Sequence, residues 1–264
     1  TFNASAKQRD LRNILRINEQ SALSKVHEYT SIGGWSRLAL ETSDNKLIPL
    51  LLLPPTDPSL GYLVIINPAG KGAISEDLVA SLKKKGMGIV IADLSGTGES
   101  SSTKENTSNK SMVLHTQSRA ELWLGKTILG EWVKELGVVS DFLKSRYHAQ
   151  KVSIDGSKEA GLAGLFLAAT GGNVDAIILR DAPLSYQFDN QGSVDFFSMG
   201  IHLPGFLNWG DVSLAAALSG KNIRIINPVT MSGVKISDSG LKEYKAEFAK
   251  LRTISKQHGE TIFN

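Results

Sequence analysis

From residue 61 onward, the chain alternates short, continuously apolar runs with longer stretches that have helical periodicity. Apolar runs of this length are typical of strands buried on both faces of a parallel sheet. We expect such strands at 62–66, 88–92, 152–154, 175–179 and 223–226, with a short last strand at 261–263. The helical stretches are 75–85, 122–147, 162–169, 212–218 and 241–256. This alternation predicts an α/β fold with a mostly parallel, doubly wound sheet covered by helices on both faces.

The first 60 residues have a different pattern. Residues 4–18 place Leu11, Ile14, Leu15 and Ile17 at helical spacing and predict an amphipathic helix. Residues 36–53 predict two antiparallel strands around a polar turn at 43–45. Without an internal repeat or a linker, we expect a single domain over 1–264, with 1–35 as a helical extension packed on it.

Two segments have no regular periodicity. The polar stretch 101–111 is expected to be a mobile loop. The stretch 185–210 reads as an irregular insertion that is rich in aromatic residues, namely Tyr186, Phe188, Phe196, Phe197, Phe206 and Trp209. These rings could stack on sugars or could pack the insertion onto the domain, and the sequence does not decide between the two.

The segment KVSIDGSKEAGLAG, residues 151–164, is the centre of the chain's candidate chemistry. A strand that runs through a sharp glycine turn into a closely packed helix is the build of a nucleophile elbow. With Gly156 in the usual Gly-x-nucleophile-x-Gly register, the nucleophile position is held by Lys158. An ammonium group is acylated usefully only if its surroundings lower its pKa, and the neighbouring Glu159 favours the charged form instead.

Ser157 is the one serine at this turn. If it were the nucleophile, Asp155 and Glu159 would occupy positions that need almost no side chain. We interpret Ser157 primarily as a turn hydroxyl, with a nucleophilic role as the alternative.

Composition excludes several classes of function. The net charge of +3 over 264 residues is small and its lysines and acids are interspersed, so neither nucleic acid nor an anionic membrane is indicated as a partner. No apolar run approaches the roughly 20 residues that cross a bilayer. Without cysteine there is no thiolate site, the acids and histidines lack metal-ligand spacing, and Gly96-Thr97-Gly98 lacks the third glycine of a dinucleotide loop. We expect no cofactor and no metal.

Three ordered segments, INPAGKGA, DLSGTGES and IDGSKEAG, resemble α/β-hydrolases, and most closely bacterial carbohydrate esterases of the acetyl xylan esterase-like and glucuronoyl esterase-like type. The stretches Leu203-Pro204-Gly205 and Gly210-Asp211 add to this resemblance. It implies an α/β-hydrolase fold, an oxyanion-hole-like role for Gly70, Lys71 and Glu159, and a structural role for Asp93 in its glycine turn.

The resemblance also shows what is missing. A serine hydrolase needs a nucleophile, a histidine and an orienting acid. The family's serine aligns with Lys158, the loop after strand 223–226 has no carboxylate until Asp238, and the nearest histidine to the last strand is His258.

Two functions remain open. In the first, this is a degenerate carbohydrate-esterase-like domain without catalysis, acting as a structural or glycan-binding module of a longer protein. In the second, it hydrolyses esters of acylated plant polysaccharide, with Ser157 as nucleophile, His202 or His258 as base, and Asp181 or Asp211 as the orienting acid. Because the chain opens without an initiator Met, we expect a processed chain or part of a longer one, in the periplasm or outside the cell.

Overall fold

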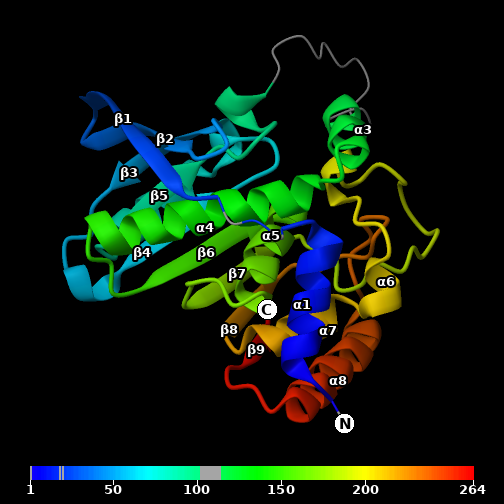
Figure 1. The fold of residues 1–264 in the computed structure, drawn as a ribbon. Helices are drawn as coiled ribbons and strands as arrows, with labels where there is room; N and C mark the ends of the chain where they lie inside the picture. Colours follow the sequence, from blue (N-terminus) through cyan, green and yellow to red (C-terminus); the bar gives the residue numbers. More distant parts are fainter. Residues whose placement is uncertain (1, 18, 20, 102–113) are drawn as a thin grey trace.

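The computed structural model describes residues 2–17, 19, 21–101 and 114–264. Nine strands form one sheet in the order β1-β2-β3-β5-β4-β6-β7-β8-β9 (Figure 1). The strands are β1 Leu23–Ile32, β2 Trp35–Thr42, β3 Leu47–Leu53, β4 Tyr62–Ile66, β5 Gly88–Ala92, β6 Val152–Ser157, β7 Ala176–Arg180, β8 Asn222–Ile226 and β9 Thr261–Phe263. This confirms the predicted α/β class.

The sheet has an antiparallel part and a parallel part. β1, β2 and β3 form an antiparallel meander, and β3 pairs antiparallel with β5. From β5 to β9 every neighbouring pair is parallel. β6 lies between β4 and β7 in the middle of the parallel part. The loop after β6 therefore lies at the centre of the side of the sheet where the parallel strands have their carboxyl ends, and ligands of α/β proteins usually bind on that side.

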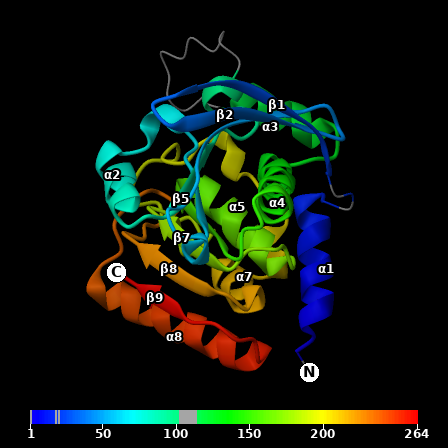
Figure 2. The ribbon, with the colours of Figure 1, turned by 90° about the vertical axis from the view of Figure 1, so that its left-hand side faces the viewer.

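Helices cover the two faces unequally, as the view in Figure 2 makes plain. The larger hydrophobic core lies on the face covered by α4, α5 and α7, and a smaller core lies beneath α2 on the other face. The helices of more than one turn are α1 Ala4–Leu15, α2 Glu76–Lys84, α3 His115–Trp123, α4 Ile128–Arg146, α5 Lys158–Ala169, α7 Val212–Ser219 and α8 Asp238–Ser255; α6 is the single turn Phe206–Trp209.

The structure corrects two predicted elements. The extension 1–35 is not helical throughout, because β1 lies within it and pairs with β2 along the edge of the sheet. The single helix expected over 122–147 is instead two helices, because Gly125 has a φ of 74° and Thr127 begins α4 by accepting a hydrogen bond from the Gly130 N–H. The hairpin around 43–45 is confirmed.

Helix α1 is docked by polar contacts at both of its ends. Near its start, Lys7 Nζ donates to the Trp209 carbonyl over 2.7 Å, and Trp209 Nε1 donates back to the Lys7 carbonyl over 2.8 Å. At its end, the Leu15 carbonyl accepts from Thr127 Oγ1, and Arg12 donates to the Thr170 carbonyl at the end of α5. These contacts place α1 across α4, α5 and the segment around α6 (Figure 1).

Within the described part of the chain, no helix is long and apolar enough to cross a membrane. The loop predicted at 101–111 falls, apart from residue 101, outside the described residues.

Candidate active site

The turn between β6 and α5 has the geometry of a nucleophile elbow. A Cβ added at Gly156 would lie 2.4 Å from the Gly161 Cα, and one added at Gly161 would lie 2.5 Å from the Gly156 carbonyl oxygen, so both positions require glycine for strand and helix to approach. Lys158 follows with a φ of 51°. A side chain in this left-handed region costs about 1–3 kcal/mol and is typical of functional turns. Lys158 therefore occupies the nucleophile's backbone position.

The Lys158 side chain is partly buried and lies against residues 185–210, which we call the cap. Its Nζ donates to the Phe196 carbonyl over 3.1 Å and lies 4.1 Å from the centre of the Phe196 ring. A carbonyl oxygen and an aromatic face both stabilise an ammonium cation. The elbow thus presents a cation that the cap holds in place.

Glu159, the next residue, is fully buried and also contacts the cap. One carboxylate oxygen accepts from the Ser198 N–H over 3.1 Å, while the other has no hydrogen-bond partner among the described residues. Burial raises the pKa of Glu159, and the hydrogen bond from Ser198 and the charge of Lys158 offset only part of that effect. Two consecutive elbow residues, Lys158 and Glu159, therefore hold the cap through hydrogen bonds.

The oxyanion-hole-like loop after β4 is fastened to the turn after β5. Asp93, which is buried, accepts from the Lys71 N–H over 2.7 Å, from Lys71 Nζ over 2.6 Å and from the Glu99 N–H over 2.8 Å. The Gly70 N–H donates to the Asn67 carbonyl. This confirms the structural role expected for Asp93, and it means that the N–H groups of Gly70 and Lys71 are already used within the protein.

Ser157 ends β6 in an extended conformation, with a φ of −92° and a ψ of 144°. Its hydroxyl makes no hydrogen bond to any described residue and does not cap α5. The structure thus places Ser157 beside the strained position rather than on it. Its role as nucleophile, the alternative to that of a turn hydroxyl, stays a prediction.

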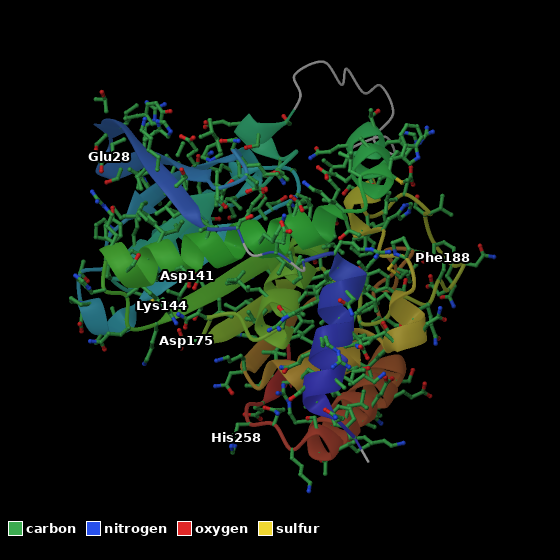
Figure 3. The ribbon with its side chains drawn as sticks, in the orientation of Figure 1. Glu28, Asp141, Lys144, Asp175, Phe188 and His258 are labelled. Carbon is green, nitrogen blue, oxygen red and sulfur yellow. The ribbon has the colours of Figure 1, made fainter. Side chains whose placement is uncertain are left out.

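The two candidate histidines lie in different places. His258 precedes β9, and β9 is parallel to β8, so this residue is at the amino edge of the sheet, opposite the elbow. Figure 3 shows His258 at the lower left, while Phe188 of the cap lies at the right. His202 is in the cap, exposed, directly after the short 3-10 helix Met199–Ile201, and its ring has no hydrogen-bond partner in the described residues. Of these two histidines, only His202 belongs to the cap, which contacts the elbow.

The candidate acids are placed at the carboxyl edge but serve other contacts. Asp211 begins α7 and accepts from the N–H groups of Val212 and Tyr186, over 2.8 and 2.9 Å, and from the Ser185 hydroxyl. Burial raises the pKa of Asp211. Asp181 follows β7 with a φ of 50°, and its N–H donates to the Ile226 carbonyl. Neither acid has a histidine among its hydrogen-bond partners in the part of the chain that is described.

The loop after β8 packs on the cap. A Cβ added at Gly233 would meet the Phe196 ring at 2.2 Å, and the Ser193 N–H donates to the Ser232 carbonyl over 3.0 Å. The Phe196 ring is thus in contact with Lys158 and with Gly233. Where the resemblance implies an acid-bearing loop, this chain has a loop that supports the cap.

Sequence reasoning missed Phe196 and Ser198 as the partners of the elbow. Phe196 was visible only as one aromatic residue among several, and the contact of Lys158 uses its backbone carbonyl, which no side-chain pattern reveals. The pair of Asp155 with Arg180 was missed as well, although the two residues lie on neighbouring strands; Arg180 donates to both carboxylate oxygens over 2.6 and 2.7 Å.

Most aromatic residues of the cap pack its interior. Phe197, Phe206 and Trp209 are buried, and Phe206 lies with ring centres 4.6 Å from Tyr186 and 5.3 Å from Trp209. Phe188 is different, with 46% of its surface exposed. The open question of the sequence is thus answered in favour of packing for these three rings.

The strand order, the central β6 and the elbow define an α/β-hydrolase fold, and solved structures agree. A proposed acetyl xylan esterase from Bacteroides fragilis NCTC 9343 matches with a TM-score of 0.65 at 14% identity, over 98% of this chain and 74% of that one. The acetyl xylan esterase from Paenibacillus sp. R4 gives 0.56 at 11% identity, over 100% and 87%. A Pyrococcus furiosus esterase gives 0.59 at 12%, over 93% and 88%.

At these identities the likeness establishes an α/β-hydrolase fold, and it confirms the resemblance to acetyl xylan esterases in structure. No family model and no curated protein matches this chain.

Proposed function

We propose that this chain is a carbohydrate-esterase-like α/β-hydrolase domain that does not catalyse ester hydrolysis and serves as a structural or glycan-binding module of a longer protein. The observation that carries the proposal is Lys158 at the strained elbow position, with its ammonium group bound to the Phe196 carbonyl and ring. A charged amine has no lone pair with which to attack an ester carbonyl.

The surroundings of the elbow support the same proposal. The Lys71 N–H is bound to Asp93, and an N–H engaged in this way is not free for the oxyanion of a tetrahedral intermediate. The cap occupies the position above the elbow through Phe196 and Ser198.

As the ligand we propose acylated plant polysaccharide, and we propose that the protein is located in the periplasm or outside the cell. It is supported by the fold shared with acetyl xylan esterases and by the exposed ring of Phe188 in the cap. A glycan-binding module is expected to bind acetylated xylan, and Phe188→Ala should then weaken that binding. If the module is purely structural, neither protein binds the polysaccharide.

Hydrolysis of p-nitrophenyl acetate and of acetylated xylan tests the absence of catalysis. We expect the wild-type protein, Ser157→Ala and Lys158→Ser all to give the rate of buffer, because a serine restored at 158 still lacks a histidine and an acid within a triad. Turnover by the wild type that disappears in Ser157→Ala contradicts the proposal and identifies Ser157 as the nucleophile.

A further inference from the structure

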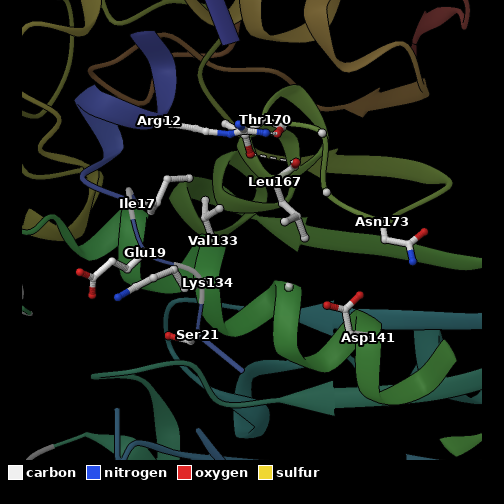
Figure 4. A pocket seen from close by; sticks show the side chains of 13 residues that line it. Arg12, Ile17, Glu19, Ser21, Val133, Lys134, Asp141, Leu167, Thr170 and Asn173 are labelled. Carbon is white, nitrogen blue, oxygen red and sulfur yellow. Dashed lines mark hydrogen bonds between the residues drawn. The ribbon is translucent and has the colours of Figure 1, made fainter. Parts of the chain in front are cut away.

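A cavity of about 390 Å³ lies between α1, α4 and the end of α5 (Figure 4). It is separate from the elbow, because Lys158 and Thr170 stand at opposite ends of α5, which at 1.5 Å per residue is about 18 Å long. Its volume is within the range of small-molecule sites, roughly 300–1,000 Å³. Ile17, Val133 and Leu167 give the cavity an apolar part.

One wall of the cavity contains a glycine that packing does not require. Gly137 lies in the interior of α4, where glycine costs about 1 kcal/mol relative to alanine. A Cβ added there would meet only Leu167 Cδ1, at 3.8 Å, which is an ordinary van der Waals contact. The same helix contains Gly130, where an added Cβ would lie 1.9 Å from the Leu15 carbonyl oxygen. Gly130 is explained by close packing, whereas Gly137 leaves room in the cavity.

Four charged side chains line the cavity. Figure 4 shows Arg12 and Asp141 at opposite ends of it, whereas Glu19 lies beside Lys134. Among the described residues, the Arg12 side chain donates one hydrogen bond, to the Thr170 carbonyl, and neither Arg12 nor Asp141 forms an ion pair. Lys134 also lines the cavity, but its charge is taken by Glu131, 2.7 Å away. Arg12 and Asp141 thus place a cation at one end of the cavity and an acid at the other.

We propose that this cavity binds a short peptide of about three residues, with its terminal carboxylate at Arg12 and its terminal ammonium at Asp141. Val133, Gly137 and Asp141, which line it from α4, are spaced four apart and extend over roughly 12 Å of the helix. An extended chain advances about 3.3–3.6 Å per residue, so about three residues match this length. An apolar side chain fits Val133, Leu167 and the space at Gly137. The inference is independent of the function proposed for the elbow.

Calorimetric titration with trileucine tests the proposal directly. We expect saturable binding to the wild-type protein and a loss of at least roughly tenfold in affinity in Gly137→Leu, which fills the cavity. Gly137→Ala is a second, smaller substitution that keeps the fold and should weaken binding to a lesser degree. Thermal unfolding of both variants establishes that they are folded.

Modified peptides assign the two ends. Asp141→Asn should weaken trileucine roughly tenfold or more, since a charge-assisted contact is lost, but should leave N-acetyl-trileucine unchanged. Arg12→Gln should weaken trileucine in the same way and leave its C-terminal amide unchanged. Asp77→Asn, an exposed acid on α2, is the matched control and should change nothing.

The proposal is overturned if the wild-type protein does not bind trileucine at millimolar concentration, or if Gly137→Leu binds it as well as the wild type does. Binding of an acetylated xylo-oligosaccharide in this cavity, blocked by Gly137→Leu and without peptide binding, also overturns it.

Discussion

Lys158 is held in a backbone conformation that costs energy for any residue with a side chain, and its ammonium group is bound by Phe196. In an active hydrolase such strain serves to expose a nucleophile above the sheet. Here the same strain directs a cation into the cap. The chemistry of the site is therefore decided by which side chain occupies one turn, while the turn itself is retained.

Removing the ammonium should loosen the cap. In Lys158→Met, the loss of the hydrogen bond to Phe196 and of the cation–π contact is expected to speed amide hydrogen exchange of residues 193–200 by roughly 30-fold, since such contacts are each worth about 1 kcal/mol. Lys250→Met, on the exposed face of α8, is the control. Equal exchange rates of residues 193–200 in the two variants would show that the contacts of Lys158 with Phe196 do not hold the cap.

Two glutamates on α4 have pKa values that are shifted in opposite directions, so we predict opposite effects of pH on their contributions to stability. Burial raises the pKa of Glu135 to about 6, despite hydrogen bonds from Ser95 and the nearby charge of Lys46. The folded state then binds this proton more tightly than the unfolded state, so stability falls as pH rises from 4.5 to 6, by about 2 kcal/mol. Relative to Glu135→Gln, the wild type should lose this amount between pH 4 and pH 7.5 in urea unfolding.

The pKa of Glu131 is shifted in the opposite direction, downward. Burial alone would raise its pKa, but Lys134 and Lys46 outweigh burial and hold the pKa below its usual value. Its contribution to stability is present above the unfolded-state pKa and is lost as pH falls through the folded-state pKa. Compared with Glu131→Gln, the wild type should therefore lose stability toward acid. If the free energy of unfolding of the wild type changed with pH in parallel with that of Glu135→Gln or of Glu131→Gln, this account would be contradicted.

At the scale of elements, α4 contains two glycines, Gly130 and Gly137, whose missing side chains have different structural consequences. Gly130→Ala places a methyl group against the Leu15 carbonyl and should destabilise the protein by about 1–3 kcal/mol, because α1 and α4 must separate. Gly137→Ala meets only ordinary contact and should stabilise it by up to about 1 kcal/mol through helix propensity. Chemical unfolding of both variants measures the difference, and an equal effect would refute this interpretation of the two positions.

Elements with strong periodicity could be predicted from the sequence, and elements fixed by partners could not. The buried parallel strands are continuous apolar runs, and all five were found. β1 was missed because its face is mostly exposed and its order comes from pairing with β2, which leaves little apolar pattern to detect. The break between α3 and α4 depends on Gly125 and Thr127, which are weak signals inside an otherwise helical stretch.

At the scale of the whole molecule, the order of motifs along the chain was sufficient to predict the α/β-hydrolase fold, because each motif follows a strand of the parallel sheet. The site was predicted only in part. The elbow, Gly70, Lys71 and Asp93 lie at the expected edge, since all follow parallel strands. The contacts of Lys158 and Glu159 with the cap could not be predicted, because an irregular segment has no periodicity that fixes its path.

The same topology separates Ser157 from His258, one of its two candidate bases. His258 precedes a parallel strand, so it lies at the edge opposite Ser157, and Asp211 is bound to the start of the cap and of α7. An activated serine would need an imidazole within hydrogen-bond reach. This arrangement is the reason for expecting a domain that retains the fold of an esterase without its reaction.

Covalent labelling by a fluorophosphonate, followed by intact mass measurement, tests that central claim without any assumption about the substrate. An active acetyl xylan esterase serves as the positive control. We predict no adduct on the wild-type protein or on Lys158→Ser. A stoichiometric adduct on the wild type that is absent from Ser157→Ala would contradict the account, because it would require an activated serine at the elbow.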